Sequence, residues 1–432
     1  MTGAWSRAAL PFLALVLPLR LEGQDPTRSD TVLARLTAEA VAANPALTSQ
    51  RAMAVAATAR VRPAGALPDP MLNVGVMDLT LPSFAFRQSD FTEVDVELSQ
   101  EFPWPGTLGA RTAAATAQAR ARAADVAARR RDVIARTAEL YYRLRYIVAA
   151  RATLQRQRDL LATGVEISTT RYATTTAPQS DPLQARVALA RLDTESADLE
   201  AQEAELRAQL KALRNIAGPD SLSIEPIRPK LVPVPVQPAS ASAGGAAVDS
   251  AGPDSLPEHP RLVARRAEIE AAEQTVRVER LGGRPDFTLM TRYGARPIAS
   301  DFFSAFVGVR IPLYAGRKQH RLTDAARADA DAARAALAEE QADLAEEIRT
   351  VGAQIRAEGT RLQLLSDQVV PSAQATVDAS LRVYRVGKVD FLTVLATEDA
   401  LYRAELDAAR VAAEYLTHLV MLEQLLARED AR

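Results

Sequence analysis

The sequence predicts an α+β membrane protein in which four short β-strands and very long α-helices are arranged as two internal repeats. Three observations support this class. Four segments alternate apolar and polar residues, three others carry apolar residues at every seventh position, and the same order of elements occurs twice. Alternation over about ten residues is typical of transmembrane barrel strands, whereas a seven-residue repeat is typical of coiled coils.

Residues 1–23 are predicted to be a secretory signal peptide. Arg7 precedes a run of about 12 apolar residues, from Ala8 to Leu19, and a polar stretch begins near Glu22. This run is too short to span a membrane, and its basic start is typical of an export signal. A buried N-terminal helix is the alternative, and no small-x-small triplet defines a cleavage site.

The two repeats are predicted at residues 24–217 and 259–432. Each begins with helical sequence that includes a proline at a first helical position, Pro45 in one repeat and Pro260 in the other. Residues 218–258 between the repeats are rich in Pro, Ala, Ser and Gly. Because this composition cannot build a packed core, we interpret the segment as a connector.

Each repeat contains two predicted strands. They lie at about 71–79, 91–102, 286–294 and 302–311. Within 91–102, valine and leucine alternate with Glu93, Asp95 and Glu97, so one face of the strand is apolar and the other is acidic. An amphipathic sheet on a soluble core would show the same alternation, so the strands alone leave both environments open.

Two long helices follow the strands in each repeat. They are predicted at about 107–172, 182–215, 317–385 and 390–428. In the first three of them apolar residues recur every seven positions, as in the set Ile348, Ile355, Leu362, Val369 and Val383. Such seams predict coiled coils, and a helix of roughly 65 residues would be about 100 Å long. A cytosolic coiled-coil scaffold is the alternative, but it explains neither the export signal nor the strands.

Four strands per chain leave two open sheet edges, which a lipid bilayer does not tolerate. Closure into an oligomeric transmembrane β-barrel therefore requires several chains with cyclic symmetry, and three chains would supply twelve strands and room for a pore. The residues predicted to face the barrel lumen are polar, as a water-filled conduit requires. They are Asn73, Glu93, Asp95, Glu97, Arg292 and Arg310.

Composition excludes several other functions. The net charge of −2 gives no electrostatic reason to expect a nucleic-acid partner, and the absence of cysteine removes disulfides, thiolate ligands and a lipid-anchored Cys. His259, His320 and His418 have no ligand spacing, so neither a metal nor another cofactor is expected. No nucleophile–base set or phosphate loop is present, and we therefore do not expect an enzyme.

Motifs at the ends of the predicted strands and helices carry a family resemblance. Glu-Phe-Pro-Trp-Pro-Gly-Thr-Leu at 101–108 and Ile-Pro-Leu-Tyr-Ala-Gly-Arg at 311–317 stand where strand becomes helix. Arg171-Tyr172 and Tyr-Arg-Val-Gly-Lys-Val-Asp-Phe-Leu at 384–392 stand at two helical tips. This set resembles the junctions and tips of the TolC family of outer-membrane efflux proteins, over essentially the whole chain after the signal peptide. Leu-Pro-Asp-Pro-Met-Leu at 67–72 is most similar to the heavy-metal efflux branch.

The resemblance implies a homotrimer with a twelve-stranded barrel in the bacterial outer membrane and an α-helical tunnel in the periplasm. It also implies two partners, a periplasmic membrane-fusion (adaptor) protein and an inner-membrane transporter of the resistance-nodulation-division type. The expected function is the exit duct of a tripartite efflux pump. A type I protein-secretion duct and, in another class, a soluble periplasmic coiled-coil scaffold remain alternatives, and the transported substrate stays open.

The tips and junctions hold the candidate functional residues that follow from the resemblance. The predicted aperture or adaptor-contact residues are Arg171, Tyr172, Asp181, Tyr384, Gly387, Lys388, Asp390 and Thr393. Thr393 and Ala396 stand where the family archetype has two acidic aperture residues, so the gate chemistry is expected to differ. Asp181 and Asp390 are also predicted helix N-caps. Trp104 and Tyr314 are predicted membrane-interface aromatics, with packing at the junction as the alternative.

Overall fold

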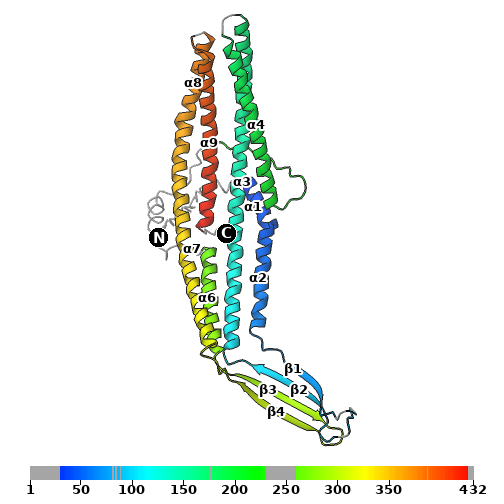
Figure 1. Ribbon diagram of the computed structural model, residues 1–432. Coiled ribbons are helices and arrows are strands. Elements are labelled where there is room, and N and C mark those ends of the chain that lie inside the picture. Colours follow the sequence, from blue (N-terminus) through cyan, green and yellow to red (C-terminus); the bar gives the residue numbers. More distant parts are fainter. Residues whose placement is uncertain are drawn as a thin grey trace, which may run out of the picture.

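The protein is an elongated molecule in which a bundle of long helices is joined at one end to a small, tilted β-sheet (Figure 1). The computed structural model describes residues 30–79, 82, 85–87, 89–174, 178–229, 259–386 and 388–426. The predicted signal peptide and most of the predicted connector lie outside these residues. The four strands and the long helices predicted from the sequence are both present.

The described part of the first repeat contains four helices and two strands. In chain order they are α1 (Thr31–Ala43), α2 (Pro45–Ala64), β1 (Met71–Met77), β2 (Glu93–Phe102), α3 (Thr107–Ala173) and α4 (Ser180–Leu213). With 67 residues, α3 runs the full length of the helical bundle (Figure 1). It packs against α2 and α6 near the sheet and against α4 and α9 toward the other end.

The second repeat follows the same order with one interruption in its first long helix. Its elements are α6 (Pro260–Leu281), β3 (Asp286–Ala295), β4 (Phe302–Arg310), α7 (Gln319–Leu364), the π-helix η2 (Leu365–Val369), α8 (Val370–Arg385) and α9 (Phe391–Leu425). The sequence predicted a single helix over 317–385. Pro371 lies at the start of α8, where the missing N–H of proline removes a backbone hydrogen bond and the helix widens by one residue.

The π-helix shifts the apolar seam of the second repeat by one residue. Before it, Ile348 and Leu362 are buried as predicted, but Val369 is 44% exposed and Val383 is exposed as well. After it the packed positions are one residue later, at Val377 and Tyr384. The prediction of one register from 348 to 383 is therefore wrong beyond Leu362, because a π-bulge adds one residue to a helical turn.

Side-chain caps define where the short helices begin. The Asn44 Oδ1 accepts a hydrogen bond from the Leu47 amide at 3.1 Å, and its Nδ2 donates to the Leu213 carbonyl at the end of α4. The His259 Nδ1 accepts from the Arg261 amide at 3.3 Å. Burial, together with the nearby charge of Arg261, lowers the pKa of His259 to about 4, so the ring is neutral and its nitrogen can accept. Both caps precede a proline at the first helical position.

The strands form one antiparallel sheet in the order β1-β2-β3-β4. The register places Val96 between Val74 and Tyr293, and Glu97 between Asn73 and Arg292. Because side chains alternate along each strand, this register collects polar residues on one face and apolar residues on the other. Among the described helices, none is both long enough and apolar enough to cross a membrane.

Candidate functional sites on the sheet and at the helical tips

The polar face of the sheet contains all the residues that the sequence assigned to a lumen. Glu93, Asp95 and Glu97 alternate along β2, Arg292 is the β3 partner of Glu97, and Arg310 pairs with Asp286 at the end of β4. Two acids on this face, Glu101 and Asp286, were missed by the sequence analysis. The alternation that selected Glu97 extends to Glu101, but both missed acids stand at strand ends, where turn residues obscure the pattern.

Ion pairs organise this polar face. Arg292 contacts the carboxylates of Glu93 and Asp95 on the neighbouring strand. Arg310 lies 2.8 Å from Glu101 and 3.6 Å from Asp286, measured from its Nη1 to the nearest carboxylate oxygen. Within the four strands the face carries five carboxylates and two arginines, and the opposite face carries no charged residue. The polar face is therefore strongly acidic.

The apolar face of the sheet is uncovered within one protomer. Val74 and Val307, on the first and last strands, are 68% and 75% exposed. Most other members are also aliphatic or aromatic, and the polar exceptions are Gln100 and Thr291. The large apolar members are Leu72, Val76, Val94, Val96, Leu98, Phe102, Phe287, Leu289, Tyr293, Phe303 and Val309. An exposed apolar surface of this extent is rare on a soluble monomer and marks contact with a membrane or a partner.

The two predicted interface aromatics have different surroundings. Trp104 is half-buried, with its ring stacked 5.9 Å from that of Phe287, the Arg284 guanidinium above it, and its backbone N–H donating to Asp286. Tyr314 is 76% exposed. Trp104 therefore packs in the junction between strand and helix, whereas Tyr314 projects from it.

At the opposite end of the bundle, α3 and α4 form one helical hairpin, and α8 and α9 form a second. The structure brings together two of the predicted tip residues, one from each hairpin. The Arg171 guanidinium on α3 lies 4.7 Å from the centre of the Tyr384 ring on α8. The Tyr384 side chain is buried and packs 5.8 Å from the ring of Phe391, while its hydroxyl has no hydrogen-bond partner among the described residues. Tyr172, predicted to match Tyr384, is instead exposed.

The two predicted caps at the tips behave differently. Asp390 caps α9, because its Oδ1 accepts from the backbone N–H and the hydroxyl of Thr393, and these hydrogen bonds lower the pKa of Asp390. Asp181 does not cap α4. The helix begins one residue earlier, at Ser180, because the Asp181 amide donates to the Pro178 carbonyl, and Asp181 lies buried in the first turn.

The acids that follow Thr393 and Ala396 on α9, Glu398 and Asp399, differ in their surroundings. Thr393 and Ala396 are both exposed, three residues apart on α9. Glu398 is buried, and burial raises its pKa to about 7, whereas Asp399 pairs with Arg403 at 2.8 Å. Lys388 is exposed, and Gly387 lies outside the described residues.

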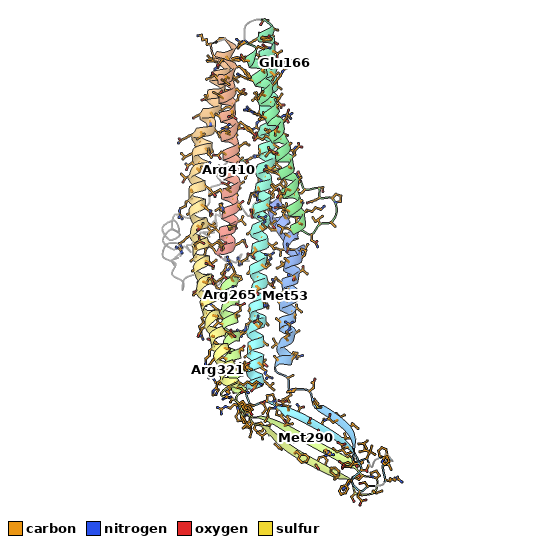
Figure 2. All side chains as sticks on the ribbon, viewed as in Figure 1. Met53, Glu166, Arg265, Met290, Arg321 and Arg410 are labelled. Atoms are coloured by element: carbon orange, nitrogen blue, oxygen red, sulfur yellow. The ribbon has the colours of Figure 1, made fainter. Side chains whose placement is uncertain are left out.

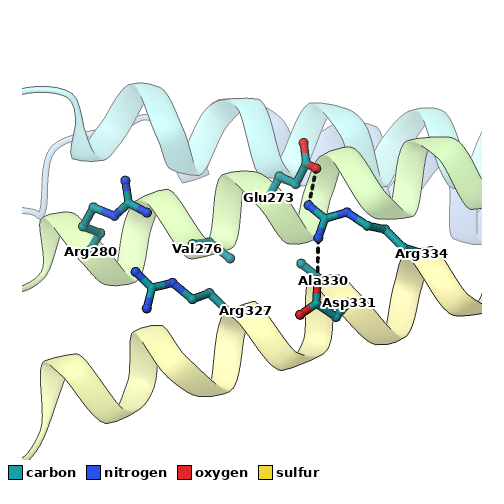
Figure 3. A pocket seen from close by; sticks show the side chains of 7 residues that line it. All are labelled: Glu273, Val276, Arg280, Arg327, Ala330, Asp331 and Arg334. Atoms are coloured by element: carbon teal, nitrogen blue, oxygen red, sulfur yellow. Dashed lines mark hydrogen bonds and ion pairs between the residues drawn. The ribbon is translucent and has the colours of Figure 1, made fainter.

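A polar cavity lies between α6 and α7 (Figure 3). Its volume is about 330 Å³, and Arg334 bridges its walls by contacting Glu273 at 2.7 Å and Asp331 at 2.6 Å. Figure 3 shows Arg280 and Arg327 together at the other end of this cavity. Within the described part of the chain, no cluster of three or more His, Cys, Asp or Glu side chains could hold a metal ion.

Comparisons with known proteins agree with this architecture. Residues 252–428 match the sequence model of the family described as Outer membrane efflux protein. The comparison with curated proteins gives no match. Among solved structures, the chain is similar to the outer-membrane channel OprN (18% identity, TM-score 0.78, covering 93% of this chain and 91% of that one).

It is also similar to the outer membrane protein VceC from Vibrio cholerae (20% identity, TM-score 0.76, covering 91% of this chain and 95% of that one). A third similar structure is the open state of the MtrE outer membrane channel from Neisseria gonorrhoeae (17% identity, TM-score 0.73, covering 91% of this chain and 88% of that one). Over 91–93% of its length the chain therefore has the fold of these outer-membrane proteins, and its second repeat matches the outer membrane efflux proteins in sequence.

Proposed function

We propose that the chain is one protomer of the outer-membrane exit duct of a tripartite efflux pump. The duct passively conducts substrate that an inner-membrane transporter and a periplasmic adaptor deliver. One observation carries this proposal: a sheet with an acidic polar face and an uncovered apolar face continues directly into helices that run the length of the molecule. The family match of the second repeat and the shared fold support it.

Oligomerisation closes the sheet. Within one protomer, β1 and β4 each have one edge without a strand partner among the described residues. Unpaired edges are not tolerated in lipid, so β4 of one copy pairs with β1 of the next. A homotrimer gives twelve strands, with Glu93, Asp95 and Arg292 facing the lumen and the apolar face in contact with lipid.

The helices extend the duct into the periplasm. Their tips lie at the end farthest from the sheet (Figure 1), where an adaptor can reach them. The contact between Arg171 and Tyr384 joins the two hairpins and narrows the aperture, while exposed Tyr172 and Lys388 are available to the adaptor. Asp390 and Thr393 hold the start of α9 in place.

The chain is exported through the predicted signal peptide at 1–23. The similarity of residues 67–72 to the heavy-metal branch favours an efflux transporter of the resistance-nodulation-division type over a protein-secretion system.

The proposal is tested in the native host by membrane fractionation combined with a transport assay. The protein is expected in the outer-membrane fraction, and its deletion is expected to raise the cellular accumulation of a fluorescent pump substrate. A protein found only in the soluble periplasmic fraction contradicts the proposal and favours a scaffold.

A further inference from the structure

Cations without acidic partners gather where the strands meet the helices. They are Arg111, Arg280, Arg317, Lys318 and Arg321, here called the basic band. All five are exposed, and none makes an ion pair with a described residue. Figure 2 shows Arg321 at the end of the helical bundle that joins the sheet. No acidic residue occurs in 102–124 or in 311–323, the two segments that leave the sheet.

Farther along the same helices, arginines have acidic partners. Arg120 on α3 lies 2.8 Å from Glu270, and Arg327 on α7 lies 3.0 Å from Asp324. Other exposed arginines on α6 and α7, such as Arg277 and Arg356, also lack an ion pair with a described residue, so the basic band is distinguished by the acid-free segments 102–124 and 311–323, which contain four of its five members.

The stability of α7 does not explain why cations stand at its N-terminus. Lys318 occupies the N-cap position of α7 and Arg321 is its third residue, while the first turn contains no acid. Positive charges at a helix N-terminus oppose the macrodipole, which favours acids there. Cations in these positions are unfavourable for α7 itself, so an external anion is the better reason for their presence.

The band adjoins the uncovered apolar surface. Ile311 and Leu313 continue beyond β4, with 63% and 81% of their surfaces exposed, and Tyr314 follows them. The amides of Arg317 and Lys318 both donate to the Tyr314 carbonyl at 3.0 Å, so one tight turn connects the apolar residues to the cations. The headgroup region of a bilayer is about 5–8 Å thick on each side, and cations that follow directly on a lipid-facing apolar surface would stand in this region.

We infer that the basic band binds the phosphate groups of phospholipid headgroups in the periplasmic leaflet of the outer membrane, an inference that rests on the function proposed above. Arginine and lysine near an anionic surface are attracted to it over about a Debye length. The band would fix the depth of the sheet in the bilayer and anchor a chain that contains no cysteine for lipidation.

Trp104 provides a local probe of this contact. The chain has two tryptophans, and Trp5 lies in the predicted signal peptide, so in the exported protein the tryptophan fluorescence comes from Trp104 at the junction. The purified protein is reconstituted with phosphatidylcholine that contains increasing fractions of brominated phosphatidylglycerol or of brominated phosphatidylcholine. Bromine quenches tryptophan at short range, so the two quenching curves give the relative affinity of the junction for the anionic lipid.

The parent protein is expected to prefer phosphatidylglycerol, and the preference is expected to weaken in high salt. Each cation near an anionic surface contributes up to about a fivefold gain in binding. The triple variant Arg317→Gln/Lys318→Gln/Arg321→Gln is therefore expected to lose the preference while phosphatidylcholine still quenches Trp104. The matched control Arg186→Gln/Arg191→Gln/Arg356→Gln removes three exposed cations from the helices away from the sheet and is expected to keep it.

Equal quenching by the two lipids in the parent protein overturns the inference but leaves the membrane placement intact. A preference that survives in the band variant, or that is lost equally in the control variant, also overturns it. Quenching by neither lipid contradicts the proposed outer-membrane function itself.

Discussion

The hydroxyl of Tyr402 on α9 donates a hydrogen bond to Glu195 on α4, with 2.8 Å between the two oxygens. A second polar contact, from Arg156 on α3 to Glu405 on α9, lies nearby at 2.8 Å. These contacts join the two helical hairpins well away from the Arg171–Tyr384 contact at the tips. The hairpins are thus connected at two levels, and movement of one against the other must break contacts at both.

Tyr402→Phe is expected to weaken the connection between the hairpins. The buried ring remains, but Glu195 loses its donor, and such a loss costs about 1 kcal/mol of unfolding free energy. Urea unfolding of the detergent-solubilised protein, followed by its helical circular dichroism, measures this cost. Tyr415→Phe is the control, because Tyr415 is also buried on α9 but its hydroxyl bonds to no described residue. Equal destabilisation by both variants would show that the hydrogen bond contributes nothing.

Glu398 is expected to make the stability of the helical bundle depend on pH. Its folded-state pKa of about 7 lies above its ordinary value of 4.5 because the carboxyl group is buried. The stabilisation is therefore fully present below pH 4.5 and is lost as the pH rises to about 7, by about 3 kcal/mol. Glu398→Gln should remove this dependence and stabilise the protein at alkaline pH.

Thermal unfolding across this pH range provides the measurement for Glu398. Asp399→Asn is the matched control, because the adjacent Asp399 pairs with Arg403 and is only partly buried. It should retain the pH dependence of the parent protein. A Glu398→Gln variant that loses stability in parallel with the parent would mean that another group titrates.

A charge on the apolar face of the sheet should prevent membrane assembly. Val307→Lys places an ammonium group among lipid chains, at a cost of about 2–4 kcal/mol near the bilayer centre. Gly308→Lys is the neighbouring control on the polar face, where a new Cβ would meet Thr288 at an ordinary 3.6 Å. The yield of assembled oligomer in the outer membrane should fall for Val307→Lys only. Equal loss for both would mean that the faces are assigned wrongly.

The acidic polar face should make the channel selective for cations. Glu97→Gln removes a carboxylate that makes no ion pair with a described arginine and is expected to reduce this selectivity, whereas Arg310→Gln is expected to increase it. Reversal potentials in planar bilayers under a KCl gradient measure both changes. Anion selectivity in the parent protein, or shifts of the same sign in both variants, would exclude this face from the conducting path.

The tip contact is expected to depend on the ring of Tyr384 and not on its hydroxyl. Tyr384→Phe retains the aromatic face beneath Arg171, whereas Tyr384→Leu removes it. Single-channel conductance should therefore rise for Tyr384→Leu and for Arg171→Gln, and change little for Tyr384→Phe. A large rise for Tyr384→Phe would instead indicate that the buried hydroxyl bonds to a neighbouring protomer.

The periodicity of the sequence predicted which strand residues share a face, but it could not predict where a long helix changes its register. Alternation along β2 was enough to place Glu93, Asp95 and Glu97 on one face, because side-chain direction in a strand follows from residue parity alone. The one-residue change of register after the π-helix, which exposes Val369 and buries Val377, was not predictable in the same way. A π-helix depends on packing around the helix, and a heptad count carries no signal for one inserted residue.

Contacts between residues that are far apart in the chain could not be predicted from the sequence either. Arg171 and Tyr384 were both candidates, yet their pairing depends on how two hairpins from different repeats pack. The basic band was overlooked for a similar reason. Its members come from α3, α6, the turn before α7 and α7 itself, and only the fold shows that they lie at one end of the bundle and lack acidic partners.

Closure of the four-stranded sheet by neighbouring copies is most directly tested by the mass of the detergent-solubilised protein. Native mass spectrometry should give a single species that contains three copies of the chain and no other polypeptide, with the complete β-sheet signal in circular dichroism. A monodisperse monomer that retains this β-sheet signal would contradict the proposed trimeric barrel, because β1 and β4 would then be stable as open edges.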